Sequence, residues 1–203
     1  PLTFLDHHLQ AGDSLLGAWL SSLRSAPGSR RRPRHDSGSL PLFEDAAFGD
    51  ALREALPVRF TLASVADDSV EEVRAKERAL AALNDGDTAL SKWKRIADLW
   101  CARWFSGHRS LSGAAFRELA DATLTGQSAL PPSVVAAGME EVRRVTSARH
   151  FFHWELEFPE VFFDAEGARL PSPGFDAIVG NPPWEMIRAD TGSAASRSQR
   201  SWW

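Results

Sequence analysis

The feature that most constrains this chain is the pentapeptide Gly-Asn-Pro-Pro-Trp at residues 180–184, which follows the apolar run at 175–179. The run predicts a short buried strand. Each proline fixes its own φ, removes a backbone donor and keeps the preceding residue out of the helical region, so Asn181 should be extended. The strand would end in a rigid turn that carries an amide, free carbonyls and an indole ring. Such a turn is suited to binding a planar molecule that carries an exocyclic amine. The alternative is a generic Pro-Pro loop with no binding role.

This motif resembles the Asn-Pro-Pro-Tyr/Phe/Trp catalytic motif of S-adenosylmethionine-dependent amino-methyltransferases, above all those that modify adenine N6 in DNA. Two further blocks are similar to the restriction-linked branch of that family, the type IIG and phage-exclusion methylases. The first block is residues 151–162, Phe-Phe-His-Trp-Glu-Leu-Glu-Phe-Pro-Glu-Val-Phe, with a Gly-Phe-Asp entry into the strand at 174–176. The second is residues 4–17, which contain Gly-Asp-Ser-Leu.

The resemblance implies an α/β fold, in which the chain forms part of the Rossmann-like sheet of a class I S-adenosylmethionine-dependent methyltransferase, interrupted by a large helical insertion. The expected parts are a strand and helix block at 1–17, the insertion at 18–149, a catalytic-motif segment at 150–190 and a tail at 191–203. Residues 9–12 and 175–180 would be neighbouring strands. Asp13 and Asn181 would then lie at the same edge of the sheet.

The resemblance also implies an activity. The enzyme would transfer a methyl group from S-adenosylmethionine to adenine N6 in double-stranded DNA, within a restriction-modification or phage-defence system, after flipping the adenine out of the duplex. Asn181, Pro182 and Trp184 are the expected catalytic residues. Asn181, Pro183 and Trp184 are expected to bind the base, and Asp13 to contact the adenine moiety of the cofactor.

The sequence lacks one feature of the family. A glycine-rich loop normally brings backbone close to the cofactor, and no Gly-x-Gly cluster precedes Asp13. We therefore expect the chain to be one part of a methylase, to depend on the remainder of its parent chain and to bind S-adenosylmethionine weakly or not at all alone. Two alternatives stay open: a methyltransferase that acts on another planar amine, in a protein glutamine or an RNA base, and a non-catalytic helical interaction segment.

Helical periodicity dominates the predicted insertion. Ser69 and Glu72 predict a capping box and a helix to about Leu83. The clearest apolar stripe predicts a helix whose tryptophans pack in a core rather than stack on bases. Weaker helices are expected near residues 43–56, 113–123 and 133–145, while the basic Ser/Gly/Pro-rich linker at 21–40 is a solvated loop or a phosphate-binding arm. The stripe consists of Leu90, Trp93, Ile96, Ala97, Trp100 and Trp104.

Composition indicates the cellular compartment in which the protein is expected to reside. Hydrophobic content of 43% and charged content of 25% are typical of a soluble globular protein. The chain has neither an export signal nor an apolar run of roughly 20 residues, so a cytoplasmic protein without a membrane partner is expected. The single cysteine, Cys101, excludes an internal disulfide and is expected to be packed and inert. The net charge of −4 does not indicate a nucleic-acid binder, although a local DNA-binding face remains compatible with it.

The titratable residues predict little further chemistry. The six histidines are scattered, and their spacing does not predict a zinc site. Glu155, Glu157 and Glu160 alternate with or follow aromatic and aliphatic residues. We therefore expect these glutamates to point outward in a structural role rather than to serve as general acids or bases.

Overall fold

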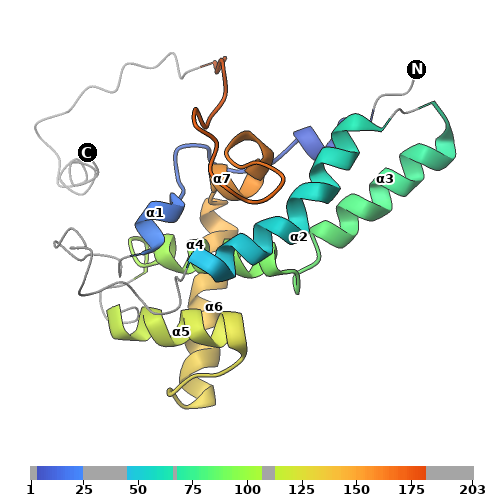
Figure 1. Ribbon diagram of the computed structural model, residues 1–203. Helices are drawn as coiled ribbons and strands as arrows, with labels where there is room; N and C mark the ends of the chain where they lie inside the picture. Colours follow the sequence, from blue (N-terminus) through green and yellow to red (C-terminus); the bar gives the residue numbers. More distant parts are fainter. Residues whose placement is uncertain (1–3, 25–44, 66–67, 107–112, 182–203) are drawn as a thin grey trace, which may run out of the picture.

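A computed structural model describes residues 4–24, 45–65, 68–106 and 113–181, whose regular secondary structure is helical (Figure 1). Within them there is no β-strand, and strand-type pairing is limited to two isolated bridges, Asp13 with Phe151 and Phe163 with Arg169. The elements are η1 Asp6–His8, α1 Leu20–Leu23, α2 Asp45–Ser64, α3 Val70–Leu83, α4 Ala89–Ala102, α5 Gly113–Thr125, α6 Pro132–Arg149, α7 Trp154–Glu157 and η3 Pro159–Val161.

The predicted α/β fold with its Rossmann-like sheet is wrong for the described residues. Residues 9–12 and 175–180 are not strands, and Ile178 and Val179 are 76% and 97% exposed. A strand requires neighbours that pair with its backbone groups and cover its side chains. Within the described residues, no segment forms strand pairing with these two runs, and of the second run Phe175 packs against other rings. Apolar composition therefore identified segments that prefer burial, but not their secondary structure.

The helices of the predicted insertion are confirmed. The Ser69 side chain accepts a hydrogen bond from the Glu72 N–H, Glu72 in turn accepts one from the Ser69 N–H, and α3 ends at Leu83 as expected. Thr88 caps α4 in the same manner, by accepting from the Ser91 N–H. The α5 and α6 helices begin at or beside their predicted starts and run further than expected.

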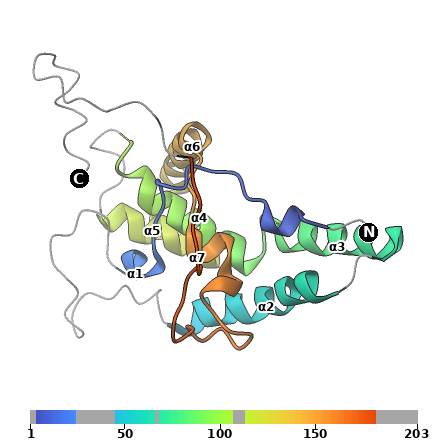
Figure 2. The same cartoon turned by 90° about the horizontal axis from the view of Figure 1, so that it is seen from above.

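The α2 helix is longer than predicted because it continues through Pro57 to Ser64. Pro57 removes one intrahelical hydrogen bond, but the burial of Leu62 against Phe4 and Leu80 stabilises the turns that follow it. The α2 and α3 helices form an arm that extends away from α5 and α6 (Figures 1 and 2). No helix in the described part of the chain, including the 20-residue α2, is both long and apolar enough to cross a membrane.

The centre of the molecule is α4, which contacts α1, α2, α5, α6 and α7. Its Ile96 and Ala97 are fully shielded from solvent. Trp93 is buried and packs edge-on against Phe48 of α2, with ring centroids 5.2 Å apart. The core role predicted for the stripe is therefore confirmed over most of its length. Trp104, which follows the end of α4, is exposed.

Cys101 lies in this core. It is buried, and desolvation, with a smaller contribution from Asp98, raises the pKa of its thiol to about 12. The thiol is thus protonated at neutral pH and has little nucleophilic character. This confirms the expected packed thiol.

Candidate functional site

The first site-forming feature is the pairing of two segments that lie far apart in the sequence, residues 12–20 and 150–155, which we call the clasp. The Asp13 N–H donates to the His150 carbonyl at 2.7 Å, and the Phe152 N–H donates to the Leu16 carbonyl at 2.7 Å. Asp13 and Phe151 form the parallel bridge between the segments. Two of the three blocks that resemble methylases are therefore in direct contact, across the whole helical region.

The clasp requires glycine at one position in particular. A Cβ atom added to Gly17 would overlap the Phe152 carbonyl oxygen and lie 2.8 Å from the carbonyl carbon. A Cβ on Gly12 would lie 2.9 Å from a ring carbon of Phe152 and 3.0 Å from the His150 carbonyl oxygen. The glycines at both ends of the Gly-Asp-Ser-Leu-Leu-Gly sequence are thus explained by close backbone approach.

His153 joins the clasp to the central helix. Its Nδ1 accepts from the Ala18 N–H at 3.0 Å, and its Nε2 lies 3.2 Å from Oδ1 of Asp98 on α4. Because Nδ1 accepts, the ring is neutral and carries its proton on Nε2, which donates to the carboxylate. The ring is only 2% exposed. In the sequence His153 stands only among aromatic residues, and this role could not be predicted because Ala18 and Asp98 are far from it in the chain.

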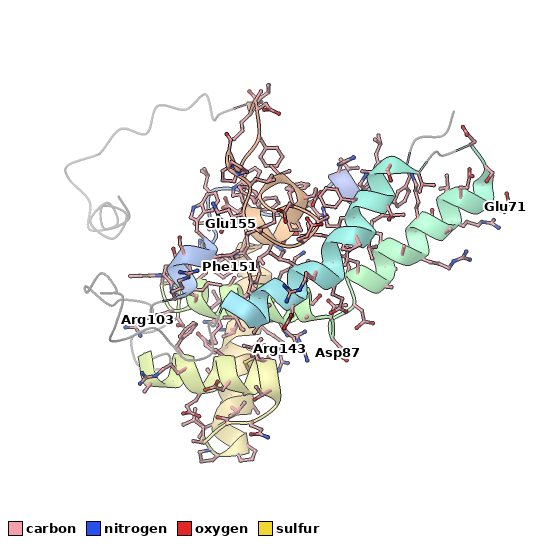
Figure 3. All side chains as sticks on the ribbon, viewed as in Figure 1. Glu71, Asp87, Arg103, Arg143, Phe151 and Glu155 are labelled. Carbon is pink, nitrogen blue, oxygen red and sulfur yellow. The ribbon has the colours of Figure 1, made fainter. Side chains whose placement is uncertain are left out.

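Glu155 is also part of the clasp, and its predicted outward orientation is wrong. It is 2% exposed and accepts from the Leu20 N–H at 2.7 Å and from the Arg169 guanidinium at 2.5 Å. Residues 154–157 form the helical turn α7, so their side chains do not alternate between two faces as they would in a strand. Figure 3 shows Glu155 and Phe151 where the N-terminal segment meets α7.

The other two glutamates of this block also hold elements together. Glu157 pairs with Lys94 of α4 at 2.8 Å. Glu160 pairs with Arg59 of α2 at 2.5 Å, and Arg59, which is buried, also donates to the His7 carbonyl. The expected structural role of this acidic block is therefore supported, with the carboxylates reaching inward to three helices rather than outward to solvent.

Asp13, the predicted cofactor ligand, lies on an exposed turn of the clasp. Its Oδ1 accepts from the Leu15 N–H at 3.0 Å, and its carbonyl accepts from the Leu16 N–H. The side chain therefore stabilises its own turn. Two cavities lie between α2 and α3 and two between α4 and α6, and Asp13 lines none of these four.

Asn181 is the last described residue and is exposed. The segment that leads to it is anchored at Phe175, whose ring meets Trp154, Phe158 and Phe162 edge-on at centroid distances of 5.5, 5.6 and 6.2 Å. The Gly174 N–H donates to Val161, and no hydrogen bond to another described residue follows until Asn181. Pro182, Pro183 and Trp184, the remaining predicted site residues, lie outside the described residues, as does the tail at 191–203.

Several basic residues of the helical body already have partners within the protein. Lys94 is paired with Glu157, Arg95 donates to the Gly86 carbonyl and Arg143 pairs with Glu140. The guanidinium of Arg149 lies 4.7 Å above the centre of the Phe105 ring. Phosphate contacts would have to compete with these interactions. Most of the predicted basic linker at 21–40 lies outside the described residues. Its first residues, 21–23, are part of α1, and Arg24 is the C-cap of that helix.

Comparisons with known proteins add no relationship: no family model, no curated protein and no solved structure matches this chain.

Proposed function

We propose that this chain contributes the base-binding segment of a cytoplasmic, site-specific DNA methyltransferase that modifies adenine N6, in a restriction-modification or phage-defence system. The observation that carries the proposal is the Asn-Pro-Pro-Trp motif, with Asn181 exposed at the end of a segment that has no regular secondary structure and is anchored by a cluster of rings at Phe175. The resemblance of the two clasp segments to the same family supports it. Duplex DNA with a flipped adenine would be the substrate.

The chemistry proposed for the motif concerns the target amine. The lone pair of an adenine amino group is delocalised into the ring, so the nitrogen is a poor nucleophile. Hydrogen bonds from its two N–H groups to the Asn181 amide oxygen and the Pro182 carbonyl would favour a pyramidal nitrogen and stabilise the positive charge that develops there. Trp184 would stack on the base, which must first leave the duplex.

Two observations favour an S-adenosylmethionine site outside the described residues. Asp13 uses one carboxylate oxygen in its own turn, and the sequence has no glycine-rich loop before it. We therefore propose that the remainder of the parent enzyme binds the methyl donor. Calorimetry on the purified chain should detect no micromolar binding of S-adenosylmethionine, and such binding would contradict this division of roles.

The decisive experiment is the substitution Asn181→Ala in the complete parent enzyme, assayed by transfer of a labelled methyl group to adenine-containing duplex DNA. We expect a loss of about 10²–10³-fold in turnover, as for other groups that stabilise developing charge. Trp184→Ala should instead weaken capture of the base by about 1–3 kcal/mol, while Trp184→Phe retains most of the activity. Asn84→Ala, at the C-terminal cap of α3, is the matched control.

A non-catalytic helical interaction segment is the rival function, and the absence of a sheet from the described residues favours it. The two proposals differ in a measurable way. If the complete enzyme methylates DNA and Asn181→Ala keeps full activity, the motif has no catalytic role. If the complete enzyme transfers no methyl group to DNA, RNA or protein, the interaction segment is the better description.

A further inference from the structure

Two cavities adjoin each other between α2 and α3, which run side by side in the arm (Figures 1 and 2). One has a volume of about 480 Å³ and the other of about 240 Å³, and Val58 and Ala79 line both. Along α2 the lining residues run from Ala51 to Val65, a distance of about 21 Å at the helical rise of about 1.5 Å per residue. We call this continuous, elongated space the α2–α3 groove.

The groove exists because α3 faces α2 with small side chains. Ala75, Ala79 and Ala82 line it, so the space that larger aliphatic side chains would fill between two packed helices is left open. On the α2 side, Val58 and the buried Leu62 form an apolar wall. Apolar surface that remains in contact with water does not gain the free energy of burial. The groove is therefore stabilised by an apolar occupant.

The polar groups that line the larger cavity already have partners within the protein. The Glu72 carboxylate accepts from two backbone N–H groups at the start of α3, at 2.9 and 2.8 Å. The Lys76 ammonium donates to the Val65 carbonyl at 2.5 Å, and the Thr61 hydroxyl donates to a carbonyl one turn earlier in α2 at 2.7 Å. The charges of Glu72 and Lys76 sum to zero. The larger cavity thus favours an uncharged ligand.

The smaller cavity adds one charged side chain, Glu54, which is exposed to solvent, and the hydroxyl of Thr88, which caps α4. Among the described residues, the buried side-chain polar atoms without a hydrogen-bond partner belong to His7, Ser106 and Thr146. None of these three lines the groove. The one unbalanced charge of the groove is therefore a solvated carboxylate, which disfavours an anion, and recognition must come from apolar contact.

The size and shape of the groove indicate the kind of molecule that fits. A volume of about 480 Å³ is typical of small-molecule sites, which are also lined mostly by apolar groups. Because the space is elongated and its walls are aliphatic, an unbranched alkyl chain can contact both helices along its whole length. A compact ring system would fill only part of it.

We propose that the α2–α3 groove binds an uncharged small molecule through a long, unbranched alkyl chain, which lies between Val58 of α2 and Ala79 of α3. This site does not depend on the proposed methyltransferase function. None of the residues that line it belongs to the clasp or to the Asn-Pro-Pro-Trp motif.

The test is an NMR titration of the ¹⁵N-labelled chain with decanol, and with octanol and decanoate as comparison probes. We expect decanol to cause saturable shifts of the Val58, Ala75 and Ala79 amides. Octanol should bind about 15-fold more weakly, because each buried methylene contributes about 0.8 kcal/mol. Decanoate should bind at least about tenfold more weakly, because its carboxylate would lose water without gaining a partner. The absence of saturable shifts at these residues, equal affinity for the two alcohols, or decanoate binding as tight as that of decanol would overturn the proposal.

A matched pair of substitutions in α3 locates the site. Ala79→Leu extends an aliphatic side chain into the groove and should weaken decanol binding at least about tenfold, because the alkyl chain loses its contact surface. Ala75→Leu, at a more exposed point of the same wall, repeats this test if the first variant is destabilised in thermal melts. Ala81→Leu adds the same side chain at an exposed position of α3 outside both cavities and should bind normally.

Two outcomes of the variant experiment would contradict the site. Binding that is unchanged in Ala79→Leu and Ala75→Leu would show that decanol associates elsewhere. If sedimentation shows that the free chain is a dimer and that Ala79→Leu dissociates it, the occupant of the groove is a second copy of the chain rather than a small molecule.

Discussion

Replacing Gly17 with alanine tests whether the clasp holds the fold together. The new methyl group would overlap the Phe152 carbonyl oxygen, so that carbonyl must move by more than about 1 Å to reach an ordinary contact distance. The Phe152 N–H to Leu16 bond of 2.7 Å and the Ala18 N–H to His153 bond of 3.0 Å flank this point. A displacement of that size breaks both bonds. Two lost bonds, with the buried His153 nitrogen left unpaired, amount to about 3–5 kcal/mol.

The assay is urea denaturation followed by far-UV circular dichroism and tryptophan fluorescence, from which the free energy of unfolding is obtained. Gly49→Ala is the matched control, because the nearest atom to a Cβ there is an arginine nitrogen 3.9 Å away and the residue lies in α2. The control should stabilise the protein by about 0.5–1 kcal/mol through helix propensity. A Gly17→Ala protein within about 0.5 kcal/mol of the wild type, a typical surface effect, would refute the close approach.

Three further predictions concern buried titratable groups. Burial, reinforced by His8 and Arg59, lowers the pKa of His7 below its ordinary value of 6.5, so the unfolded chain takes up a proton first as the pH falls. Stability should decline below about pH 6.5, and His7→Phe should flatten this part of the pH profile in thermal melts. Glu155→Leu should destabilise by about 2–3 kcal/mol, since it leaves the Leu20 N–H unpaired, and Glu155→Gln by less than half as much in the same urea assay. Because its pKa is about 12, Cys101 should react with iodoacetamide at pH 8 only as fast as the protein unfolds, as followed by mass spectrometry.

The sequence predicted the helices well because a helix satisfies its hydrogen bonds within one segment. The capping box at Ser69 and Glu72 places the start of α3 without reference to anything outside the helix. The apolar spacing from Leu90 to Trp100 likewise identifies the face that α4 buries. The predicted helix at 43–56 was too short, because its apolar spacing was followed only to Leu56, whereas α2 continues to Ser64 and buries Leu62.

The strands could not be predicted in this way, because a strand obtains its hydrogen bonds from other segments. Residues 175–180 have the composition of a buried strand, yet nothing in the described residues pairs with them. The orientation of Glu155 failed for a related reason. Alternation is a valid guide only if the segment is extended, and the turn of helix α7 places that carboxylate inside.

The sequence by itself determined the helical periodicity and the capping box of α3, both of which depend on residues a few positions apart. Only the tertiary structure decided that Asp13 meets Phe151, that His153 joins the clasp to α4 and that the Glu155 carboxylate is buried against Leu20. The two residues in each of these contacts are at least 55 positions apart in the sequence. Their energies depend on which groups are desolvated together, and that is fixed by packing rather than by any local pattern.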